Sequence, residues 1–582
     1  MNTLLKLMKK RAWGYVLATA AMIAAITLDM FNPYLVGNIV DKVIINGDFS
    51  YLKGALLCLG GITIGRAILG YLKEYGFDLT SSKIIVDLRK DLFDHIQKLS
   101  FSFFDKNNTG ELMSRIKDDT DNIMHALCFG IMLLLEQSIY FIIASVILFT
   151  LNWKLALISL VTMPVIEFVV FRLEKKIGST YEKISDQRAV LNTTAQQNLT
   201  GVRLVKAFGR EKYEIQKFLE QNQENYRINV DQVKIMANHN PVIEFLSNVV
   251  LVLVISFGGY FVIGGELSLG ELVAFSNYIF MLIWPMRMMG WLTNVLAQCL
   301  ASVKKIDKIF TEESEITNPS NPVKPEVLSG HVEFRNVDFK IGDACILKDV
   351  SINAQKGSTI AVMGITGAGK SSLINLIGRY YDCTSGEVCI DGVNVKNMRL
   401  DVLRKNVAVV MQDVFLFSDT IEENIKFGLD MKSTDPAFIC AAKDSMVDEF
   451  VCQMKDGYNT VIGERGIGLS GGQKQRISIA RALVRDAKVL ILDDSTSALD
   501  METEYHIQKA LNKRRDITRF IIAHRISAVK NADEIVYFDN GSIAERGTHD
   551  ELLALEGKYY KTYCAQYSGY DHEFDKEVSN AC

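Results

Sequence analysis

The sequence has no marked excess of either charge and very little proline. Its 582 residues contain 64 Lys and Arg and 68 Asp and Glu, for a net charge of -4, and only 8 prolines. A protein that binds nucleic acid by neutralising phosphates needs a basic excess, so this composition argues against that class. A cleavable signal peptide is not evident either, because the apolar stretch after the basic start has no small-residue cleavage site.

Cysteine occurs without the spacing of a metal site or of a disulfide framework. The 10 cysteines include no Cys-x-x-Cys pair and no short cluster. We expect reduced thiols, several of them buried in apolar runs: Cys58, Cys128 and Cys299. The chemistry of the chain is therefore expected to come from other residue types.

Hydrophobic residues are abundant and unevenly distributed. They make up 49% of the chain although 23% is charged, and nearly all the long apolar stretches precede residue 305. A helix needs about 20 mostly apolar residues to cross a bilayer. Six stretches predict membrane spans: Trp13–Pro33, Gly54–Leu72, Leu127–Leu151, Leu155–Phe171, Ile243–Ile263 and Leu272–Leu296.

Basic residues predict the orientation of these spans, because Lys and Arg are enriched on the cytosolic side. One set of connecting segments has 4, 7 and 12 of them, at 1–11, 78–124 and 172–240. The opposite set has only 2, 1 and none, at 41–53, 151–154 and 264–270. We therefore expect a multi-pass protein of a bacterial cell membrane, with the N-terminus and the whole C-terminal half in the cytosol.

The two long basic loops are not expected to be linkers. Ser82–Leu99 and Lys183–Glu220 have the charged amphipathic pattern of helices, so the membrane helices should extend well into the cytosol. A short interfacial helix is expected at 4–10. Three prolines within 319–325 mark a linker. The predicted organisation is a transmembrane domain at 1–310, a linker at 311–329, a second domain at 330–567 and a disordered acidic tail at 568–582.

A phosphate-binding loop is the strongest motif of the second domain. Gly364–Ser371 matches GxxxxGK[ST], and it follows an apolar strand, Thr359–Met363, and precedes a helix, Ser372–Ile377. Glycines let backbone N–H groups close around phosphates at a helix N-terminus. Lys370 should reach the β- and γ-phosphates and Ser371 the Mg²⁺ ion. The residues expected to contact nucleotide here are Gly364, Thr366, Gly367, Ala368, Gly369, Lys370, Ser371 and Ser372.

Two further motifs complete this domain. The strand Val489–Leu492 ends in Asp493, and an acid at the end of a buried strand is the usual Mg²⁺-binding partner of such a loop. Between the loop and this strand lies Leu469-Ser-Gly-Gly-Gln473. Ser470 and two glycines at a helix start would form a second anion cradle.

With these motifs in this order, the chain resembles a half-transporter of the ATP-binding-cassette (ABC) exporter family. The resemblance covers about residues 5–567 and implies a six-span α-helical transmembrane domain joined to an α/β P-loop ATPase domain. It implies ATP and Mg²⁺ as ligands and a dimer with a second half-transporter. Each ATP would lie between the phosphate loop of one chain and the signature of the other: Ser470, Gly471, Gly472 and Gln473.

Other residues match family positions one by one. Gln412, in Val-Val-Met-Gln-Asp, resembles the glutamine that contacts Mg²⁺ and water, so the implied metal ligands are Ser371, Gln412 and Asp493. His524 resembles the histidine that senses the γ-phosphate, and Asp500 the residue that crosses the dimer interface. The segments 103–112 and 205–211 resemble the two cytosolic loops whose short helices dock on the ATPase domains.

Two positions depart from the family pattern. Asp494 follows Asp493, where active members carry the Glu that polarises the attacking water. Asp is one methylene shorter, and catalysis depends on close positioning of the base. Ile341 stands where an aromatic side chain usually stacks on adenine. Both changes affect this chain's own nucleotide, whereas the signature used by the partner's nucleotide is intact.

This asymmetry favours a heterodimer with a weakly hydrolysing site, whose partner chain carries the catalytic Glu. A homodimer with a slow Asp base is the alternative. A non-pumping regulatory or ATP-gated subunit, and an importer built on the exporter scaffold, are further alternatives. The transported substrate, drug-like, lipid or peptide, is not specified by these motifs.

Four acids fall in or near the predicted spans: Asp29, Glu136, Glu167 and Glu244. Ionisable side chains at such depth usually face a cavity or a partner. They would attract cationic substrates, or they would pair with Arg66 and Arg287, or they would lie near the bilayer surface. The sequence leaves these three interpretations open.

Overall fold

The computed structural model describes residues 2–323, 325 and 328–567. The chain forms two compact units, which we name by their secondary structure. The helical unit consists of residues 1–98 and 107–313, and the sheet unit of residues 99–106 and 314–582. The predicted tail at 568–582 lies outside the described residues.

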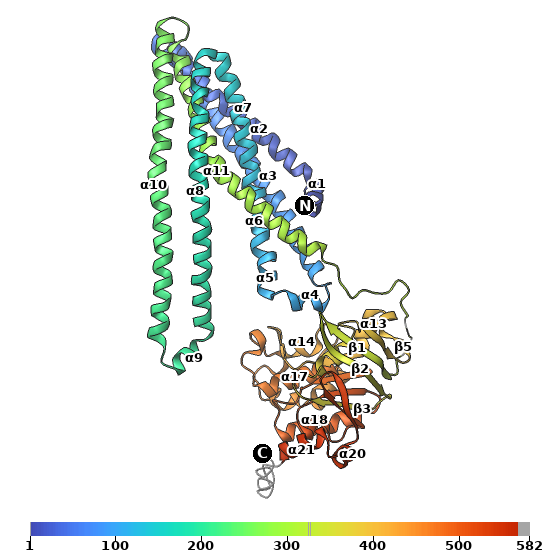
Figure 1. The fold of residues 1–582 in the computed structure, drawn as a ribbon. Coiled ribbons are helices and arrows are strands. Elements are labelled where there is room, and N and C mark those ends of the chain that lie inside the picture. Colours follow the sequence, from blue (N-terminus) through green and yellow to red (C-terminus); the bar gives the residue numbers. More distant parts are fainter. Residues whose placement is uncertain (1, 324, 326–327, 568–582) are drawn as a thin grey trace. The chain divides into compact units, whose positions relative to one another are not determined.

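The helical unit contains long helices joined by short turns (Figure 1). Its helices are continued by three stretches of π-helix, at Val40–Ile45, Arg115–Asp119 and Ala126–Gly130. In a π-helix each backbone hydrogen bond joins residues five positions apart, compared with four in an α-helix. The α-helices are α1 (Asn2–Lys10), α2 (Ala12–Ile39), α3 (Phe49–Ile96), α5 (Thr109–Ser114), α6 (Thr120–His125), α7 (Ile131–Leu151), α8 (Trp153–Thr200), α9 (Val202–Ala207), α10 (Glu211–Ile263) and α11 (Leu269–Thr311).

Several of these helices are longer than a bilayer requires. The 48 residues of α3 span about 72 Å at 1.5 Å per residue, more than twice the hydrocarbon thickness of about 30 Å. Within the described residues, four helical segments carry an apolar stretch long enough to cross a membrane: Ala12–Ile45, Phe49–Ile96, Thr109–Leu151 and Glu211–Ile263. Shorter apolar stretches lie at Trp153–Val165 and Leu269–Trp284. The predicted apolar spans therefore lie within longer helices, and the rest of each helix is partly polar.

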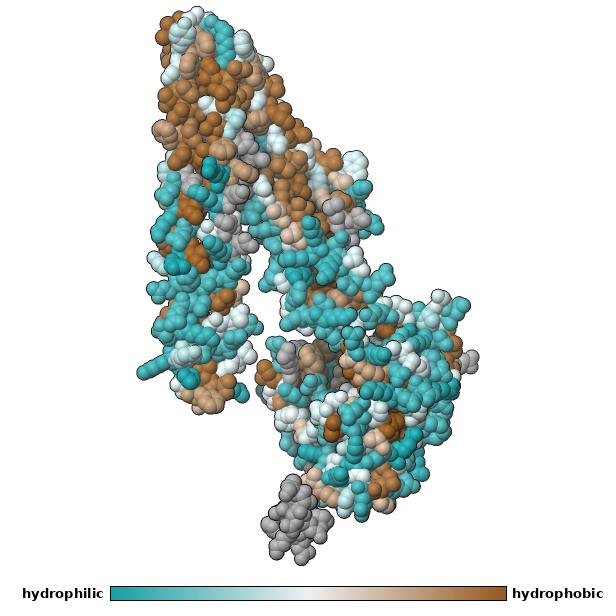
Figure 2. All heavy atoms as spheres, in the orientation of Figure 1, coloured by the Kyte–Doolittle hydropathy of each residue, from teal (hydrophilic) through white to brown (hydrophobic). Residues whose placement is uncertain are grey.

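Helices α8 and α10 lie side by side and are joined at one end by α9 (Figure 1). Their ends near α9 are mainly hydrophilic, whereas the opposite end of the helical unit has a broad apolar surface (Figure 2). The prediction of one helix over 183–220 is wrong in detail. The chain leaves the helical conformation at Gly201 and again at 208–210, where Gly209 has a φ of +61° that glycine adopts readily.

The start of α11 is fixed by a capping box and by the end of α2. Ser268 Oγ accepts a hydrogen bond from Glu271 N at 2.9 Å, and Glu271 Oε2 accepts one from Ser268 N at 2.8 Å. Asp41 accepts from Ser268 Oγ and from Gly270 N, at 2.5 and 2.7 Å. A Cβ atom at Gly270 would lie 2.0 Å from the Gly37 carbonyl oxygen, so only glycine permits this helix contact.

The sheet unit contains two sheets. The larger has the strand order β10-β9-β3-β8-β7-β6 and is parallel except at β10, and the smaller is antiparallel with the order β2-β1-β4-β5. The strands are β1 (Val332–Ile341), β2 (Ala344–Ala354), β3 (Thr359–Gly364), β4 (Ser385–Ile390), β5 (Val393–Asn394), β6 (Val407–Val410), β7 (Val489–Asp493), β8 (Thr518–Ile522), β9 (Glu534–Asp539) and β10 (Ser542–Gly547).

Helices surround these sheets. They are α4 (Phe101–Lys106), α12 (Lys370–Ile377), α13 (Leu400–Asn406), α14 (Ile421–Lys426), α15 (Pro436–Asp444), α16 (Val447–Val451), α17 (Gly471–Leu483), α18 (Met501–Lys513), α19 (Ile526–Val529), α20 (His549–Ala554) and α21 (Lys558–Tyr567). Short 3₁₀ turns occur at Val395–Asn397, Gly457–Asn459 and Glu464–Gly466.

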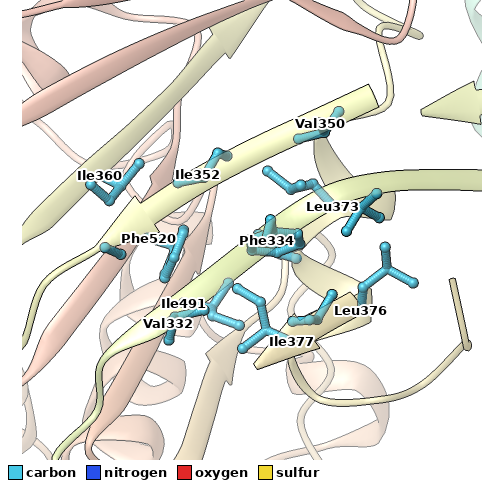
Figure 3. Packing of buried hydrophobic residues seen from close by; sticks show 14 of the residues in the cluster. Val332, Phe334, Val350, Ile352, Ile360, Leu373, Leu376, Ile377, Ile491 and Phe520 are labelled. Carbon is cyan, nitrogen blue, oxygen red and sulfur yellow. The ribbon is translucent and has the colours of Figure 1, made fainter. Parts of the chain in front are cut away.

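One hydrophobic core lies between the smaller sheet, α12 and one face of the larger sheet (Figure 3). Phe334 of β1 lies near Leu376 and Ile377 of α12 in this core. Burying each such side chain stabilises the fold by about 1.5–3 kcal/mol. A second core covers the other face of the larger sheet with α14 to α18. These two cores cover both faces of β7, whereas the second face of β3 belongs to a third cluster with Ala361 and Met363, so every residue of both strands is buried.

Segment 99–106 packs within the sheet unit although it is encoded between membrane helices. The Phe101 ring lies 4.7 Å from that of Tyr380, centroid to centroid, and the Tyr381 hydroxyl donates to Asp105 at 2.5 Å. Burial and the Asp105 carboxylate raise the pKa of Tyr381, so this hydroxyl stays a donor. The short helix α4 therefore packs within the sheet unit. The resemblance of 103–112 to a cytosolic docking loop implies such packing.

The predicted topology can be tested by cysteine labelling in intact cells. Gly264→Cys places a thiol in the α10–α11 turn, where φ is -73° and a Cβ meets no atom closer than 3.4 Å. Ser320→Cys places one in the exposed segment before β1. In a background without the exposed Cys58, Cys440 and Cys452, an impermeant maleimide should label Gly264→Cys in intact cells and Ser320→Cys only after permeabilisation. Reversed access would contradict the orientation.

Candidate nucleotide-binding site

The phosphate loop joins β3 to α12 and has backbone geometry that requires glycine. Gly364 and Gly369 have φ angles of +140° and +95°. A Cβ at Gly364 would lie 2.3 Å from the Phe538 carbonyl oxygen, and one at Gly369 would lie 2.8 Å from the Ile346 carbonyl oxygen. Gly367, at +84°, faces open space, so its requirement is conformational. The loop thus presents backbone to any ligand that binds there.

Lys370 begins α12 and is held across this loop. Its Nζ donates to the carbonyl oxygens of Gly364 and Ile365, both at 2.8 Å, and the residue is only 6% exposed. Burial lowers the pKa of Lys370, and the nearby carboxylates of Asp493 and Asp494 oppose that shift. Four other residues of the loop were predicted to contact nucleotide. Thr366 and Ser371 are exposed, Ser372 is half-buried and Ala368 is buried.

Asp493 ends β7 and lies next to the loop. Its carboxylate is buried, and the Ser371 side chain is close enough to favour the charged form of this acid. Burial raises the pKa of Asp493, while Ser371, Lys370 and His524 oppose that shift. Two of the predicted Mg²⁺ ligands are therefore neighbours.

The oxygen donors of this pair suit a magnesium ion, which prefers a few carboxylate or hydroxyl ligands completed by water and phosphate oxygens. Within the described residues, no group of three or more His, Cys, Asp or Glu side chains is placed to hold a metal ion alone. The residues present fit Mg²⁺ that arrives with a nucleotide, with Ser371 and Asp493 as its protein ligands.

Parallel strand pairing brings the other predicted catalytic residues to the same edge. Val410 pairs with Leu492, and Asp493 pairs with Ile522. Gln412 follows β6 by two residues and His524 follows β8 by two residues, so both leave the sheet at the edge where the phosphate loop begins; β8 is next to β3, whereas β6 lies beyond β7. Both side chains are exposed.

Asp494 is the first residue beyond β7 and is half-buried. Its φ is +45°, and its backbone N–H donates to the Ile522 carbonyl oxygen at 2.9 Å. The carboxylate is close enough to Asp493 and Lys370 to influence the pKa of each. The structure therefore places this acid beside Asp493 and Lys370, and its role as a base stays a prediction.

Ile341 lies at the end of β1, in a hairpin whose second strand also contains Ile346. The Ile346 carbonyl oxygen faces Gly369 of the phosphate loop. Ile341 is 54% exposed, so an aliphatic side chain is available at this end of the loop.

The signature begins α17. Ser470 Oγ accepts a hydrogen bond from Gln473 N at 3.3 Å, and Gln473 Oε1 accepts one from Ser470 N at 2.9 Å, which forms a capping box. Among the described residues, the structure shows no hydrogen bond or ion pair between 470–473 and 364–372.

Gln475 is a buried residue to which the sequence analysis assigned no role. Its Oε1 accepts from Ala498 N at 3.0 Å, and its Nε2 donates to Ser497 Oγ at 3.2 Å. Gly472 packs on the same segment, since a Cβ there would lie 3.1 Å from the Ala498 carbonyl oxygen. The signature helix is thereby joined to the segment that follows Asp494. In the sequence, its position two residues after the signature is the one feature that could have indicated this role.

The acids of the helical unit are partly paired. Asp29 is 4% exposed and accepts from Arg66 at 2.8 Å and from the Tyr140 hydroxyl at 2.9 Å. Glu136 accepts from Lys73 at 2.9 Å. Ion pairing thus accounts for two of the four predicted acids. The side chain of Glu167 lies outside the described residues. Glu244 lines a cavity between α10 and α11.

Comparisons with known proteins agree with this arrangement. A family model described as the ABC transporter transmembrane region matches residues 15–286, and one described as ABC transporter matches residues 347–497. The chain is 35% identical to the uncharacterized ABC transporter ATP-binding protein YknU of Bacillus subtilis, over 97% of both chains. It is 34% identical to the ATP-dependent lipid A-core flippase of Syntrophus aciditrophicus, over 97% of this chain and 94% of that protein.

Two further similarities extend over almost the full chain. The putative multidrug export ATP-binding/permease protein YgaD of Bacillus subtilis is 36% identical over 94% of this chain and 95% of its own. A solved structure of a bacterial Atm1-family ABC exporter with ATP bound superposes with a TM-score of 0.82 at 26% identity, covering 96% of this chain and 98% of that one.

The bridge made by Gln475 can be tested by removing its amide. Gln475→Leu keeps the side-chain volume but leaves Ala498 N without its partner and removes one of the two bonds of Ser497 Oγ, which should cost about 1–3 kcal/mol, or roughly 2–10 °C in Tm. Thermal unfolding of the purified full-length protein measures this loss. Gln453→Leu is the matched control, because the Gln453 side chain is exposed. Equal Tm values for the two variants would contradict the bridge.

Proposed function

Because the chain belongs to the ABC transporter family, we propose that it is the weakly hydrolysing half of a heterodimeric exporter. The chain is an integral membrane protein, and its cytosolic ATPase domain couples ATP hydrolysis to transport. Exporters of this family work as dimers. The observation that carries the finer proposal is Asp494, which stands at the base position of a site whose other predicted elements are present.

The chain's own ATP binds at the phosphate loop. Backbone N–H groups of Gly364–Ser371 and the Lys370 ammonium group hold the β- and γ-phosphates. Ser371, Asp493 and Gln412 hold Mg²⁺, which when bound neutralises phosphate charge. The proximity of Ser371 to Asp493 supports this assignment, because the Ser371 side chain already favours the charged form of that carboxylate.

Two features make hydrolysis at this site slow. The Asp494 carboxylate is one methylene shorter than the Glu of active members, so it stands back from the water it would polarise. The exposed Ile341 contacts adenine without aromatic stacking. His524 senses the γ-phosphate from the end of β8. ATP bound here therefore persists through many cycles.

The signature serves the partner's ATP. Its capping box fixes the start of α17, and Gly471 and Gly472 leave backbone accessible beside Ser470. Within the described residues no hydrogen bond or ion pair joins 470–473 to 364–372, which is consistent with its use in the opposite site. The partner chain supplies the catalytic Glu, so most turnover occurs at that site.

An amphipathic substrate fits the helical unit best. A cavity of about 340 Å³ lies between α10 and α11, where Phe280, Ile283 and Trp284 stand opposite Glu244, Ser247 and Asn248. Such mixed lining suits a molecule with an apolar body and a polar group. Relatives named as a lipid A-core flippase and as a putative multidrug exporter support the same class. Transport into inverted membrane vesicles that contain the complex tests export directly.

The asymmetry between the two ATP sites predicts unequal effects of substitutions in this chain. Ser470→Ala or Gly471→Asp should nearly abolish the steady-state ATPase activity of the complex purified through a tag on this chain, because they damage the partner's site. Lys370→Ala should reduce it much less, because it damages the slow site. Equal losses from the signature and lysine variants would refute the assignment.

The role of Asp494 predicts a second contrast. A general base contributes about 10²–10⁴-fold, or roughly 3–5 kcal/mol of barrier. Asp494→Asn should nevertheless leave most of the ATPase activity of the complex, whereas replacing the partner's catalytic Glu by Gln should stop it. Single-turnover hydrolysis and nucleotide occupancy provide the measurement. If Asp494→Asn eliminates turnover as fully as the partner substitution, Asp494 is a working base and the homodimer is the correct assembly.

A further inference from the structure

The last helix of the sheet unit, α21, is anchored firmly beside β9 and β10. Tyr559 is fully buried, and its hydroxyl lies 2.7 Å from His549 Nδ1. Its backbone N–H donates to Glu545 of β10 at 2.9 Å. Tyr559 belongs to the same buried cluster as Ala523 and Ile526, which flank His524 and Arg525. The helix is therefore a rigid support next to the His524 loop.

Gln566, near the end of α21, forms hydrogen bonds to that loop through both the nitrogen and the oxygen of its side-chain amide. Its Nε2 donates to the His524 carbonyl oxygen at 2.5 Å, and its Oε1 accepts from Ile526 N at 2.9 Å. The two bonds bracket Arg525. A single side chain thus holds the backbone on both sides of the turn that follows His524.

The opposite side of this turn is held by the segment after Asp494. The Arg525 guanidinium donates to the Ser497 carbonyl oxygen at 3.2 Å. Ile526 N belongs to the first turn of α19, where backbone N–H groups have no partner within the helix. The Gln566 amide satisfies this donor, so the local backbone conformation depends on α21.

We propose that Gln566 is a positioning residue for His524 and that α21 thereby sets the direction of the γ-phosphate-sensing side chain. This inference rests on the proposed role of His524. Rotation of the His524–Arg525 peptide would redirect the imidazole, and the paired hydrogen bonds of Gln566 oppose that rotation. Positioning errors of about 1 Å are enough to weaken such a contact strongly.

The preference of the site for ATP over ADP provides the test. If Gln566 had a merely structural role, its replacement would not change this preference. ADP lacks the γ-phosphate, so a displaced His524 should weaken ATP binding and leave ADP binding unchanged. The two affinities can be measured on this chain alone, by competition of Mg·ATP or Mg·ADP against photoactivatable azido-ATP in the purified complex, with the labelled chain separated on a gel.

Gln566→Leu should reduce the preference for ATP over ADP by roughly two- to tenfold, the equivalent of about one net hydrogen bond. Gln566→Glu keeps the acceptor for Ile526 N and loses the donor for His524 O, so its preference should lie between those of wild type and Gln566→Leu. Lys561→Ala, an exposed position on the same helix, is the matched control and should leave the preference unchanged. Melting temperatures of all variants exclude unfolding of α21 as the cause.

His524→Ala serves as the reference and separates the two ways in which the inference can fail. If His524→Ala lowers the ATP preference and Gln566→Leu does not, the positioning role is wrong and the function of His524 stands. If His524→Ala leaves the preference unchanged, the proposed function of the histidine is wrong, and the role of Gln566 falls with it.

Discussion

Strand β7 pairs in parallel with β6 on one side and β8 on the other, and β8 pairs in parallel with β3. Because parallel strands share one carboxyl edge, residues that are up to 160 positions apart in the sequence leave the sheet together. The phosphate loop, Gln412, Asp493 and His524 all depend on this pairing. The hydrophobic clusters that bury both faces of β3 and of β7 hold the register, and a slip of one residue would separate Ser371 from Asp493.

The sequence predicts the parts of this site that depend on local chemistry. The phosphate loop, the acid at the end of β7 and the signature at the start of α17 have fixed spacing, and the structure places each beside the expected strand or helix. Gln475 and Gln566 were not predictable in the same way. Each is an ordinary glutamine whose partners lie 22 to 42 residues away and are mostly backbone groups, so no side-chain pattern marks them.

In the helical unit, hydropathy predicts where apolar surface lies but not where a helix ends. Lys, Glu, Leu and Arg form helices well, so α3 continues far beyond the predicted span Gly54–Leu72. Lys73 illustrates the difference, because it follows that span directly and yet is buried against Glu136. With Asp29 paired to Arg66, these contacts balance charge between α2, α3 and α7, which reduces the cost of burying it. Cys58 shows the converse: it lies in an apolar run but is exposed, because most of the apolar stretch of α3 faces outward.

The backbone at position 494 gives a physical reason for Asp rather than Glu. Asp494 has a φ of +45°, a left-handed conformation that Asp tolerates better than most residues because its short polar side chain bonds locally. The conformation is imposed by the loop, since the backbone N–H is bonded to Ile522 and the carbonyl oxygen accepts from Ser497 Oγ at 3.0 Å. Glu would extend the carboxylate toward the water but would adopt this backbone less easily. Asp at this position therefore has a shorter reach than Glu but fits the loop with less backbone strain. The same loop is joined through Ser497, Ala498 and Gln475 to the start of α17, so its conformation also supports the signature.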